Sequence, residues 1–185
     1  NNSNKHSIIS KLSNNTIAAS LCLSTATKSR FFRKIQDGCN YSCSYCTIPK
    51  ARGASKSIIP DTVVRQAVEA VSSGYKEIVL TGIHLGAYGL DLKPKVKLSK
   101  LIETILKQPT ITRIRLSSLE IREIDDGLPD LLTDKSICNH LHIPLQRGDD
   151  SILKLMNRIY NSGQFSFKIN DIAKKIPGIS IGTDV

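Results

Sequence analysis

Short apolar segments with strand character alternate with amphipathic helical segments along the chain from residue 30 onward. Five segments have the length and apolar content of strands: residues 31–36, 77–81, 112–117, 140–145 and 179–184. Five others have the periodicity of helices: residues 61–73, 98–107, 124–132, 150–157 and 165–175. Such alternation predicts parallel strands joined by right-handed helical crossovers, which is an α/β fold.

The chain is too short for a complete barrel of this type. A closed barrel of eight strands takes about 250 residues, whereas this chain has 185. The fifth predicted strand, residues 179–184, lies at the C-terminal end of the sequence with no helix after it. We therefore expect a partial, open TIM-type βα barrel with parallel strands, truncated at its C-terminal end.

Residues 1–29 differ in composition from the rest of the chain. They are rich in Asn, Ser and Thr and contain no acidic residue. This composition predicts a tail or linker, in which Cys22 is most simply a small apolar side chain. The expected organisation is thus a tail or linker at residues 1–29 and an incomplete core domain at residues 30–185.

The formal net charge of the chain is +10. Lys and Arg release counterions when they bind phosphates, so the charge fits a nucleic-acid partner, but a solvated basic surface explains it as well. No stretch approaches the roughly 20 apolar residues of a membrane span, and residues 1–10 have no apolar signal core. We expect a cytoplasmic protein with no membrane partner.

Three of the five cysteines follow the pattern Cys39-x-x-x-Cys43-x-x-Cys46, directly after the first predicted strand. Such close spacing and an odd total do not suit a disulfide framework. Thiolates are soft ligands that suit iron–sulfur clusters and zinc. Structural zinc normally needs four protein ligands with a second Cys or His pair, and the sequence shows no such pair.

Three thiolates on a four-iron cluster leave one iron without a protein ligand, and an open iron can bind a small molecule. Gly38 precedes the first cysteine and lets the backbone turn tightly. The cysteine loop also leaves the carboxyl end of a strand, where βα folds place their active sites. The pattern predicts a cluster held by Cys39, Cys43 and Cys46; a zinc or disulfide loop is the alternative.

Longer phrases of the sequence support a resemblance to a known family. They are Lys34-Ile-Gln-Asp-Gly-Cys39, Tyr45-Cys-Thr-Ile-Pro-Lys-Ala-Arg-Gly53, Val79-Leu-Thr-Gly-Ile-His-Leu-Gly86, Arg115-Leu-Ser-Ser-Leu-Glu120, His140-Leu-His-Ile-Pro-Leu-Gln146, Leu155-Met-Asn-Arg158 and Gly182-Thr-Asp-Val185. Over residues 30–185, the chain resembles the radical S-adenosylmethionine (SAM) superfamily and, within it, the methylthiotransferases.

Two phrases indicate a branch of that family. Ser117-Ser-Leu-Glu120 together with Ile137-Cys-Asn-His-Leu-His142 resembles the branch that methylthiolates threonylcarbamoyladenosine beside the tRNA anticodon. Branches that modify isopentenyladenosine in tRNA, or an aspartate of a ribosomal protein, share most of the other phrases and remain alternatives. A zinc-stabilised nucleic-acid-binding module is the alternative from a different class. Arg147 departs from the small Ser that is usual in the family.

The resemblance implies the cofactors and partners of a transferase. A three-cysteine [4Fe–4S] cluster would bind SAM at its open iron and, when reduced, cleave it to a radical that activates the target carbon. A second [4Fe–4S] cluster is expected in an N-terminal domain that this chain lacks, so we expect the isolated fragment to lack full activity. The implied partners are the anticodon stem-loop of tRNA and an electron donor such as flavodoxin or ferredoxin.

Five residues are candidates for contact with SAM. Tyr45 stands where the superfamily often carries an aromatic side chain against the adenine, although it could simply shelter the cluster. Gly82, Ser118, Glu120 and Gln146 follow the ends of three predicted strands. Their alternatives are an ordinary turn glycine for Gly82 and a helix cap for Ser118 and Glu120. No catalytic residue is assigned beyond the cluster ligands.

Two further groups of residues have simpler interpretations. His140 and His142 lie in a predicted strand, and we expect them to be core histidines with satisfied hydrogen bonds. Lys50, Arg52 and Lys56 follow the cysteine loop. They could meet tRNA phosphates, and a solvated loop explains them equally well.

Overall fold

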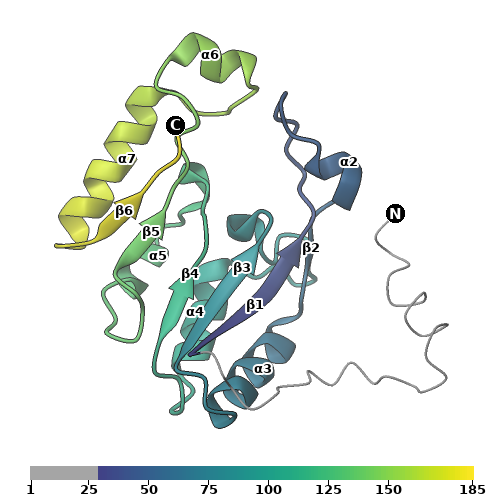
Figure 1. Cartoon of the computed structure of the whole chain (residues 1–185), viewed down its shortest axis with the longest axis vertical. Helices are drawn as coiled ribbons and strands as arrows, with labels where there is room; N and C mark the ends of the chain where they lie inside the picture. Colours follow the sequence, from purple (N-terminus) through teal and green to yellow (C-terminus); the bar gives the residue numbers. More distant parts are fainter. Residues whose placement is uncertain (1–28) are drawn as a thin grey trace, which may run out of the picture.

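The computed structural model of the protein describes residues 29–185, and its arrangement is shown in Figure 1. Six strands are present in this part of the chain: β1 (Arg30–Asp37), β2 (Lys56–Ser57), β3 (Glu77–Gly82), β4 (Ile114–Leu116), β5 (His140–His142) and β6 (Ser180–Gly182). All but β2 fall within or overlap the five predicted strands. The predicted tail, with Cys22, lies outside the described residues apart from Ser29.

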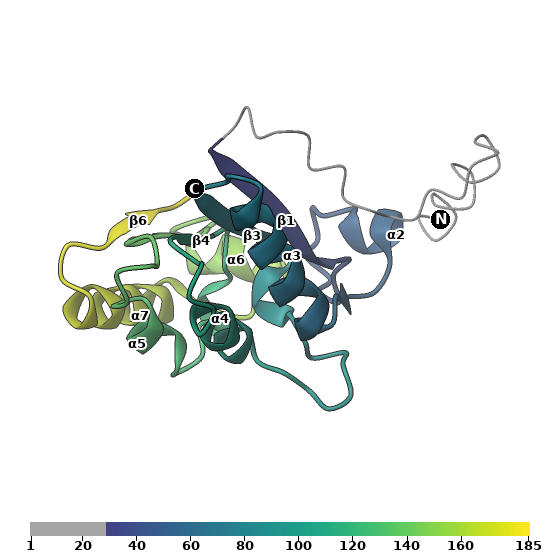
Figure 2. The ribbon, with the colours of Figure 1, turned by 90° about the horizontal axis from the view of Figure 1, so that it is seen from below.

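The helices alternate with the strands as predicted. They are α2 (Ile48–Arg52), α3 (Pro60–Ser72), α4 (Leu98–Leu106), α5 (Leu128–Leu131), α6 (Asp150–Leu155) and α7 (Ser162–Lys175), with 3₁₀ turns η2 (Leu85–Ala87) and η3 (Ile121–Glu123). Figure 2 shows α3, α4, α5 and α7 following one another along one side of the strands. None of the described helices is long and apolar enough to cross a membrane.

The strands form an open βα barrel. One sheet has the order β2-β1-β3-β4, in which β1, β3 and β4 are parallel, and a second sheet pairs β5 with β6, also in parallel. A parallel bridge between Ile114 and Ile137 joins the two sheets at the start of β4. The sheet does not close, because β2 and β6 are left as its outer strands. The predicted α/β fold with a partial parallel barrel is confirmed.

Strand β2 is the exception to the parallel arrangement. It pairs antiparallel with the end of β1, through Gln36 with Ser57 and Asp37 with Lys56. The chain comes back along β1 after the cysteine loop, and Ile58 N donates to Ile35 O at 2.9 Å. This strand was not among the five predicted from the sequence, because a strand of two residues has no period that a sequence could show.

Several predicted elements are shorter than expected, and proline explains two of them. The predicted helix at residues 124–132 is reduced to α5, which has Pro129 in its first turn. Proline suits that position but lacks the N–H that a helix interior needs. In the predicted strand at residues 140–145, Pro144 interrupts the ladder, although Ile143 N and Leu145 N still donate to Gly182 O and Asp184 O.

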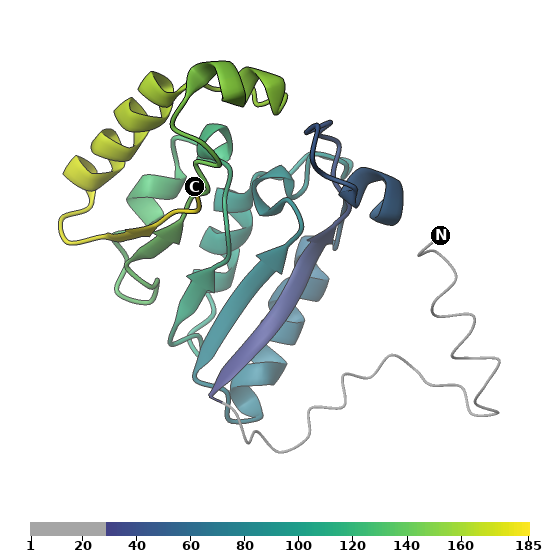
Figure 3. The same ribbon diagram turned by 45° about the horizontal axis from the view of Figure 1, so that its top comes forward.

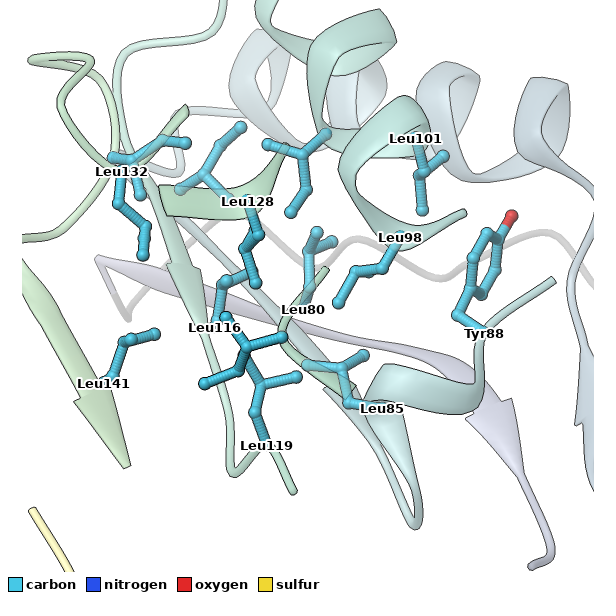
Figure 4. Packing of buried hydrophobic residues seen from close by; sticks show 14 of the residues in the cluster. Leu80, Leu85, Tyr88, Leu98, Leu101, Leu116, Leu119, Leu128, Leu132 and Leu141 are labelled. Carbon is cyan, nitrogen blue, oxygen red and sulfur yellow. The ribbon is translucent and has the colours of Figure 1, made fainter. Parts of the chain in front are cut away.

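The core lies between the sheet and the helices that cover it. Helix α4 buries Leu98, Leu101, Ile102 and Ile105 against the strands, where Leu80 of β3 is also fully buried. Figure 4 shows these leucines packed together, and Figure 3 shows the strands in front of α3 and α4. Burying one such side chain stabilises the fold by about 2 kcal/mol. This packing fixes the strands whose carboxyl ends carry the site.

Candidate functional site

The cysteine loop begins where β1 ends, and glycine is required at that point. Gly38 has a φ of +72°, and a Cβ there would lie 2.2 Å from Ala54 O. The loop closes on itself beside this residue, because Cys39 N donates to Gly53 O at 3.1 Å. A left-handed conformation and a backbone contact this close admit only glycine. Gly38 and Cys39, at the start of the loop, therefore lie against Gly53 and Ala54, at its end.

A buried glutamine ties the loop to the neighbouring strand. Gln36 is 1% exposed, and its Nε2 donates to Gly38 O at 2.8 Å and to Ser55 Oγ at 2.9 Å. Its Oε1 accepts from His84 N at 2.7 Å. A buried amide with each of these atoms satisfied is stable, whereas an unsatisfied one is costly. Gln36 thus holds the start of the loop and the end of β3 in register.

The three cysteines of the loop face one cavity at the carboxyl ends of the strands. Cys39, Cys43 and Cys46 are free, half-buried thiols, and all three line a cavity of about 210 Å³. In residues 29–185, no three Cys, His, Asp or Glu side chains are grouped to hold a single metal ion. An iron–sulfur cluster does not need such a group, because each thiolate binds a different iron.

Four of the five predicted SAM contacts line the same cavity: Tyr45, Ser118, Glu120 and Gln146. They come from the cysteine loop and from the segments that follow β4 and β5, so the fold assembles residues that are far apart in the sequence. Gly82 does not line the cavity. A Cβ at Gly82 would lie 2.9 Å from Gln36 Oε1, so the close packing of Gln36 already accounts for a glycine here.

Cys39 has a polar neighbourhood that the sequence analysis missed. His84 is 6% exposed, and its Nδ1 lies 3.5 Å from Cys39 Sγ while its other ring nitrogen contacts Glu123. Tyr41 OH donates to Glu123 Oε1 at 3.1 Å. Burial, and then the nearby carboxylate, raise the pKa of Tyr41. Burial also raises the pKa of the Cys39 thiol. His84 stands in one of the family-like phrases, which was the available signal.

Arg158 is a second residue that the sequence analysis left without a role. Its Nη1 lies 3.4 Å from Cys43 Sγ and 3.4 Å from Tyr45 OH, and its Nη2 is paired with both oxygens of Glu120. Only 4% of its side chain is exposed. Burial alone would lower the pKa of this guanidinium, but the hydrogen bonds and charge of Glu120 raise it above its ordinary value. The residue is therefore a fixed positive charge beside the cavity.

The two histidines of β5 are not core residues. Both are half-buried, and His142 Nδ1 lies 2.8 Å from Ser118 Oγ, with His142 Nε2 3.5 Å from Asp184 Oδ1. Burial and the nearby Arg115 lower the pKa of His140, whose Nδ1 has no hydrogen-bond partner. The expectation of core histidines was wrong, because both histidines alternate along β5 with Leu141, which is the residue of this strand that enters the core.

The basic residues after the cysteine loop lie beside the site. Lys50 and Arg52 are exposed on α2 and Lys56 is exposed on β2. Arg52 Nη1 lies 3.4 Å from Asp37 Oδ1, so one of the three already has a partner. Surface pairs of this kind contribute little to stability.

The donor set and the fold together define a class of protein. The soft thiols of the loop suit an iron–sulfur cluster, and polar groups from strand ends line the same cavity. A family model described as the radical SAM superfamily matches residues 34–184. The chain belongs to this superfamily, and membership implies a [4Fe–4S] cluster and SAM as cofactors.

Among curated proteins, the chain is similar to tRNA-modifying enzymes. It is 44% identical over 160 residues to the threonylcarbamoyladenosine tRNA methylthiotransferase MtaB of Bacillus subtilis, covering 85% of this chain and 35% of that protein. It is 42% identical over 163 residues to MtaB of Rickettsia prowazekii, covering 85% and 38%. A tRNA-2-methylthio-N(6)-dimethylallyladenosine synthase of Clostridium tetani is 35% identical over 160 residues, covering 86% and 35%. The chain thus spans little more than a third of these relatives.

Solved structures with the same fold are more distant in sequence. The radical SAM methyltransferase TsrM from Kitasatospora setae superposes with a TM-score of 0.64 at 16% identity, covering 82% of this chain and 30% of that one. The cobalamin-dependent radical SAM enzyme OxsB superposes with a TM-score of 0.66 at 14% identity, covering 85% and 24%. At such identities the likeness concerns the fold alone.

Proposed function

We propose that this chain is the radical SAM core of a methylthiotransferase that acts on threonylcarbamoyladenosine next to the anticodon of tRNA. The observation that carries the proposal is the shared cavity: Cys39, Cys43 and Cys46 face the same space as Ser118 and Glu120. A cavity lined only by thiols would suit a structural metal. Polar strand-end groups beside three thiols suit a cofactor bound next to a cluster.

The roles of the residues follow from their chemistry. Cys39, Cys43 and Cys46 hold the cluster as thiolates. When bound and reduced, the cluster supplies the electron that cleaves SAM. Glu120 keeps acceptor positions beyond those used by Arg158, because an ionised carboxylate offers about four, and these suit the cationic amino group of SAM. Tyr45 lies half-exposed at the cavity, where its ring can cover the adenine.

Two other candidate contacts have different local support. Ser118 and Gln146 line the cavity and can bind hydroxyl or amide groups of SAM. Gln146 has a φ of +70°, which turns the chain at the end of the barrel wall. For Gly82, close packing on Gln36 accounts for the glycine, and a contact between its backbone and SAM stays a prediction.

The choice of nucleoside is supported by the identities of the relatives. Three proteins named as threonylcarbamoyladenosine enzymes are 44%, 42% and 40% identical to this chain, whereas two named for dimethylallyladenosine are 35% and 34% identical. The dimethylallyladenosine class is the second candidate. The charge of +10 agrees with an RNA substrate in either case.

Flanking domains and a partner protein complete the proposed enzyme. The second [4Fe–4S] cluster and the firm grip on tRNA belong to flanking domains, since this chain covers little more than a third of its curated relatives. A small reducing protein such as flavodoxin or ferredoxin supplies the electron. The cytoplasm, where thiols stay reduced and tRNA is modified, is the inferred location.

The test is an anaerobic assay of the chain after its cluster has been rebuilt with iron and sulfide. Reductant, SAM and unmodified tRNA carrying threonylcarbamoyladenosine are added, with a parallel arm carrying isopentenyladenosine. We expect the 185-residue chain to form 5′-deoxyadenosine without methylthiolated nucleoside. The longer protein should methylthiolate the first tRNA and leave the second unmodified.

The possible results separate the competing functions. Modification of only the isopentenyladenosine tRNA would favour the second candidate function, that of the dimethylallyladenosine class. A colourless protein that binds one zinc ion and no cluster would favour the nucleic-acid-binding module. Multiple-turnover methylthiolation by these 185 residues alone would show that the flanking domains are not needed for sulfur transfer.

A further inference from the structure

The turn after α6 contacts the cysteine loop, although the two segments lie 115 residues apart in the sequence. Ser44 N donates to Met156 O at 3.2 Å. Asn157 Nδ2 donates to both the backbone oxygen and the hydroxyl of Ser42 at 2.8 Å. Asn157 has a φ of +58°, a conformation that Asn tolerates better than most residues. In Figure 1, α6 and the tip of the loop after β1 lie at the same end of the molecule.

Arg158 follows this turn and joins three parts of the site. Different nitrogens of one guanidinium contact Cys43 Sγ and the carboxylate of Glu120. Its Nε and Nη2 also lie 3.3 and 3.2 Å from Tyr160 OH, which donates to Leu145 O at 2.7 Å. The rigid planar fork of arginine can make such divergent contacts, whereas lysine cannot.

The burial of Arg158 makes these contacts specific. A charge with 4% of its side chain exposed is costly unless it is paired and hydrogen-bonded. Glu120 supplies the ion pair, and Cys43 accepts from the nitrogen that Glu120 does not use. A structural ion pair alone would not require that nitrogen to lie against a thiol at the cavity.

We propose that Arg158 is a positioning residue of the cluster site, which raises the reduction potential of the cluster through Cys43 and holds Glu120 toward SAM. This inference rests on the proposed function, because it takes Cys43 as a cluster ligand. Asn157 assists by holding the loop at Ser42.

The electrostatic consequence has a definite sign. A metal-bound cysteine is a thiolate, and hydrogen bonds to the sulfurs and the local net charge set the potential of a cluster. Reduction adds one negative charge, so a nearby guanidinium stabilises the reduced state more than the oxidised state. Glu120 has the opposite sign and partly offsets this effect. Removing Arg158 should lower the potential, and removing the charge of Glu120 should raise it.

The experiment is a redox titration of the full chain with its rebuilt cluster, without SAM, followed by electron paramagnetic resonance. For R158Q we expect a more negative potential, by about a tenfold change in the reduction equilibrium, which is 59 mV for one electron. R158K keeps the charge and should shift less in the same direction. E120Q should shift the potential in the opposite direction.

The matched control is Arg122, another guanidinium of the same region. Arg122 Nη1 donates to Ile159 O at 2.7 Å in place of a thiol, so R122Q should leave the potential unchanged. Asn157→Gly keeps the left-handed backbone and removes the bonds to Ser42. It should speed the loss of iron to a chelator several-fold while leaving the potential near that of wild type.

The outcomes separate this inference from the proposed function. A wild-type chain that takes up no iron–sulfur cluster overturns both. If the wild-type chain holds a cluster, but R158Q and E120Q both keep the wild-type potential or both shift it in the same direction, only the role of Arg158 is overturned. If R158Q holds no cluster, the reduction potentials of R158K and E120Q are compared instead. Equal potentials in these two variants would contradict the proposal.

Discussion

Two carboxylates paired with arginine lie at opposite ends of the same strands. Glu120 and Arg158 lie beyond the carboxyl ends, beside the thiols and the cavity. Glu77 is the first residue of β3, at the amino end, and three arginines surround it. Both carboxylates have less than a fifth of their side chains exposed. The two carboxylates are therefore similarly buried, but they differ in position in the barrel and in the number and exposure of the arginines around them.

The Glu77 cluster connects the first three parallel strands. Glu77 Oε1 lies 3.0 Å from Arg30 Nε and 2.7 Å from Arg115 Nε, while Oε2 lies 3.0 Å from Arg113 Nε. The buried thiol of Cys138 lies next to the same carboxylate, at 3.8 Å. These contacts join β1, β3 and β4 where the barrel has no active site. Carboxylates of similar burial thus connect strands at the amino end of the barrel and line the cavity at the carboxyl end, where we have proposed that Arg158 holds Glu120 in position.

The cysteines give the largest expected difference between the two ends. Each of Cys39→Ala, Cys43→Ala and Cys46→Ala should abolish the cluster, because three thiolates are needed to hold it. Cys138→Ala should keep it, since that thiol belongs to the Glu77 end. Iron and sulfide content and the visible spectrum after anaerobic reconstitution measure this. Loss of colour in Cys138→Ala alone would mean that the ligand set is wrong.

Replacing Glu77 should affect stability more than the site. Glu77→Gln leaves three arginines without their carboxylate, and we expect a loss of about 2 kcal/mol in the free energy of unfolding, below the roughly 3–5 kcal/mol of a fully buried pair. Two of the arginines are 54% exposed, so solvent limits the cost. Urea denaturation gives the stability, and iron content should match wild type. Glu69→Gln, which breaks an exposed helix pair with Arg65, is the control.

The Glu77 cluster should also make stability depend on acid. Burial alone would raise the pKa of this carboxyl, but the hydrogen bond from Arg115 and the charges of the three arginines bring it below its ordinary value of 4.5. A lowered pKa contributes stability that is present above the unfolded value and is lost as pH falls through the folded one. The difference between wild type and Glu77→Gln should therefore shrink from about pH 6 to about pH 3. A constant difference over that range would contradict this assignment.

Local patterns made much of this architecture predictable. The apolar stripe that includes Val63 and Ala67, both buried in α3, and the apolar strand segments were sufficient for the parallel βα order. The cysteine spacing and the strand-end positions of Ser118 and Glu120 were sufficient to place these residues at one cavity. Parallel strands bring their carboxyl ends together. Residues that follow different strands in the sequence are therefore neighbours in the fold.

What could not be predicted depends on contacts between distant segments. The pairing of β2 with β1, the contact of His84 with Glu123, and the contact of Arg158 with Cys43 all join residues that no local period relates. Single polar residues in loops carry no pattern of their own. Gly82 shows the converse case, because its position after a strand suggested a ligand contact while the packing of Gln36 already requires a glycine.

The smallest expected effect is that of Glu103→Gln. It tests whether Glu77 contributes more to stability than a surface carboxylate because it is buried, and not because several cations surround it. Glu103 on α4 lies 2.8 Å from Lys100 Nζ and 2.7 Å from Lys107 Nζ. Hydrogen bonds from the two lysines lower its pKa to about 2. Solvent screens such pairs, and ordering the long lysine side chains opposes them. Glu103→Gln should leave the urea midpoint within the repeatability of the measurement, and added salt should remove any residual change. A loss as large as that of Glu77→Gln would show that the cations around a carboxylate decide its contribution wherever it lies.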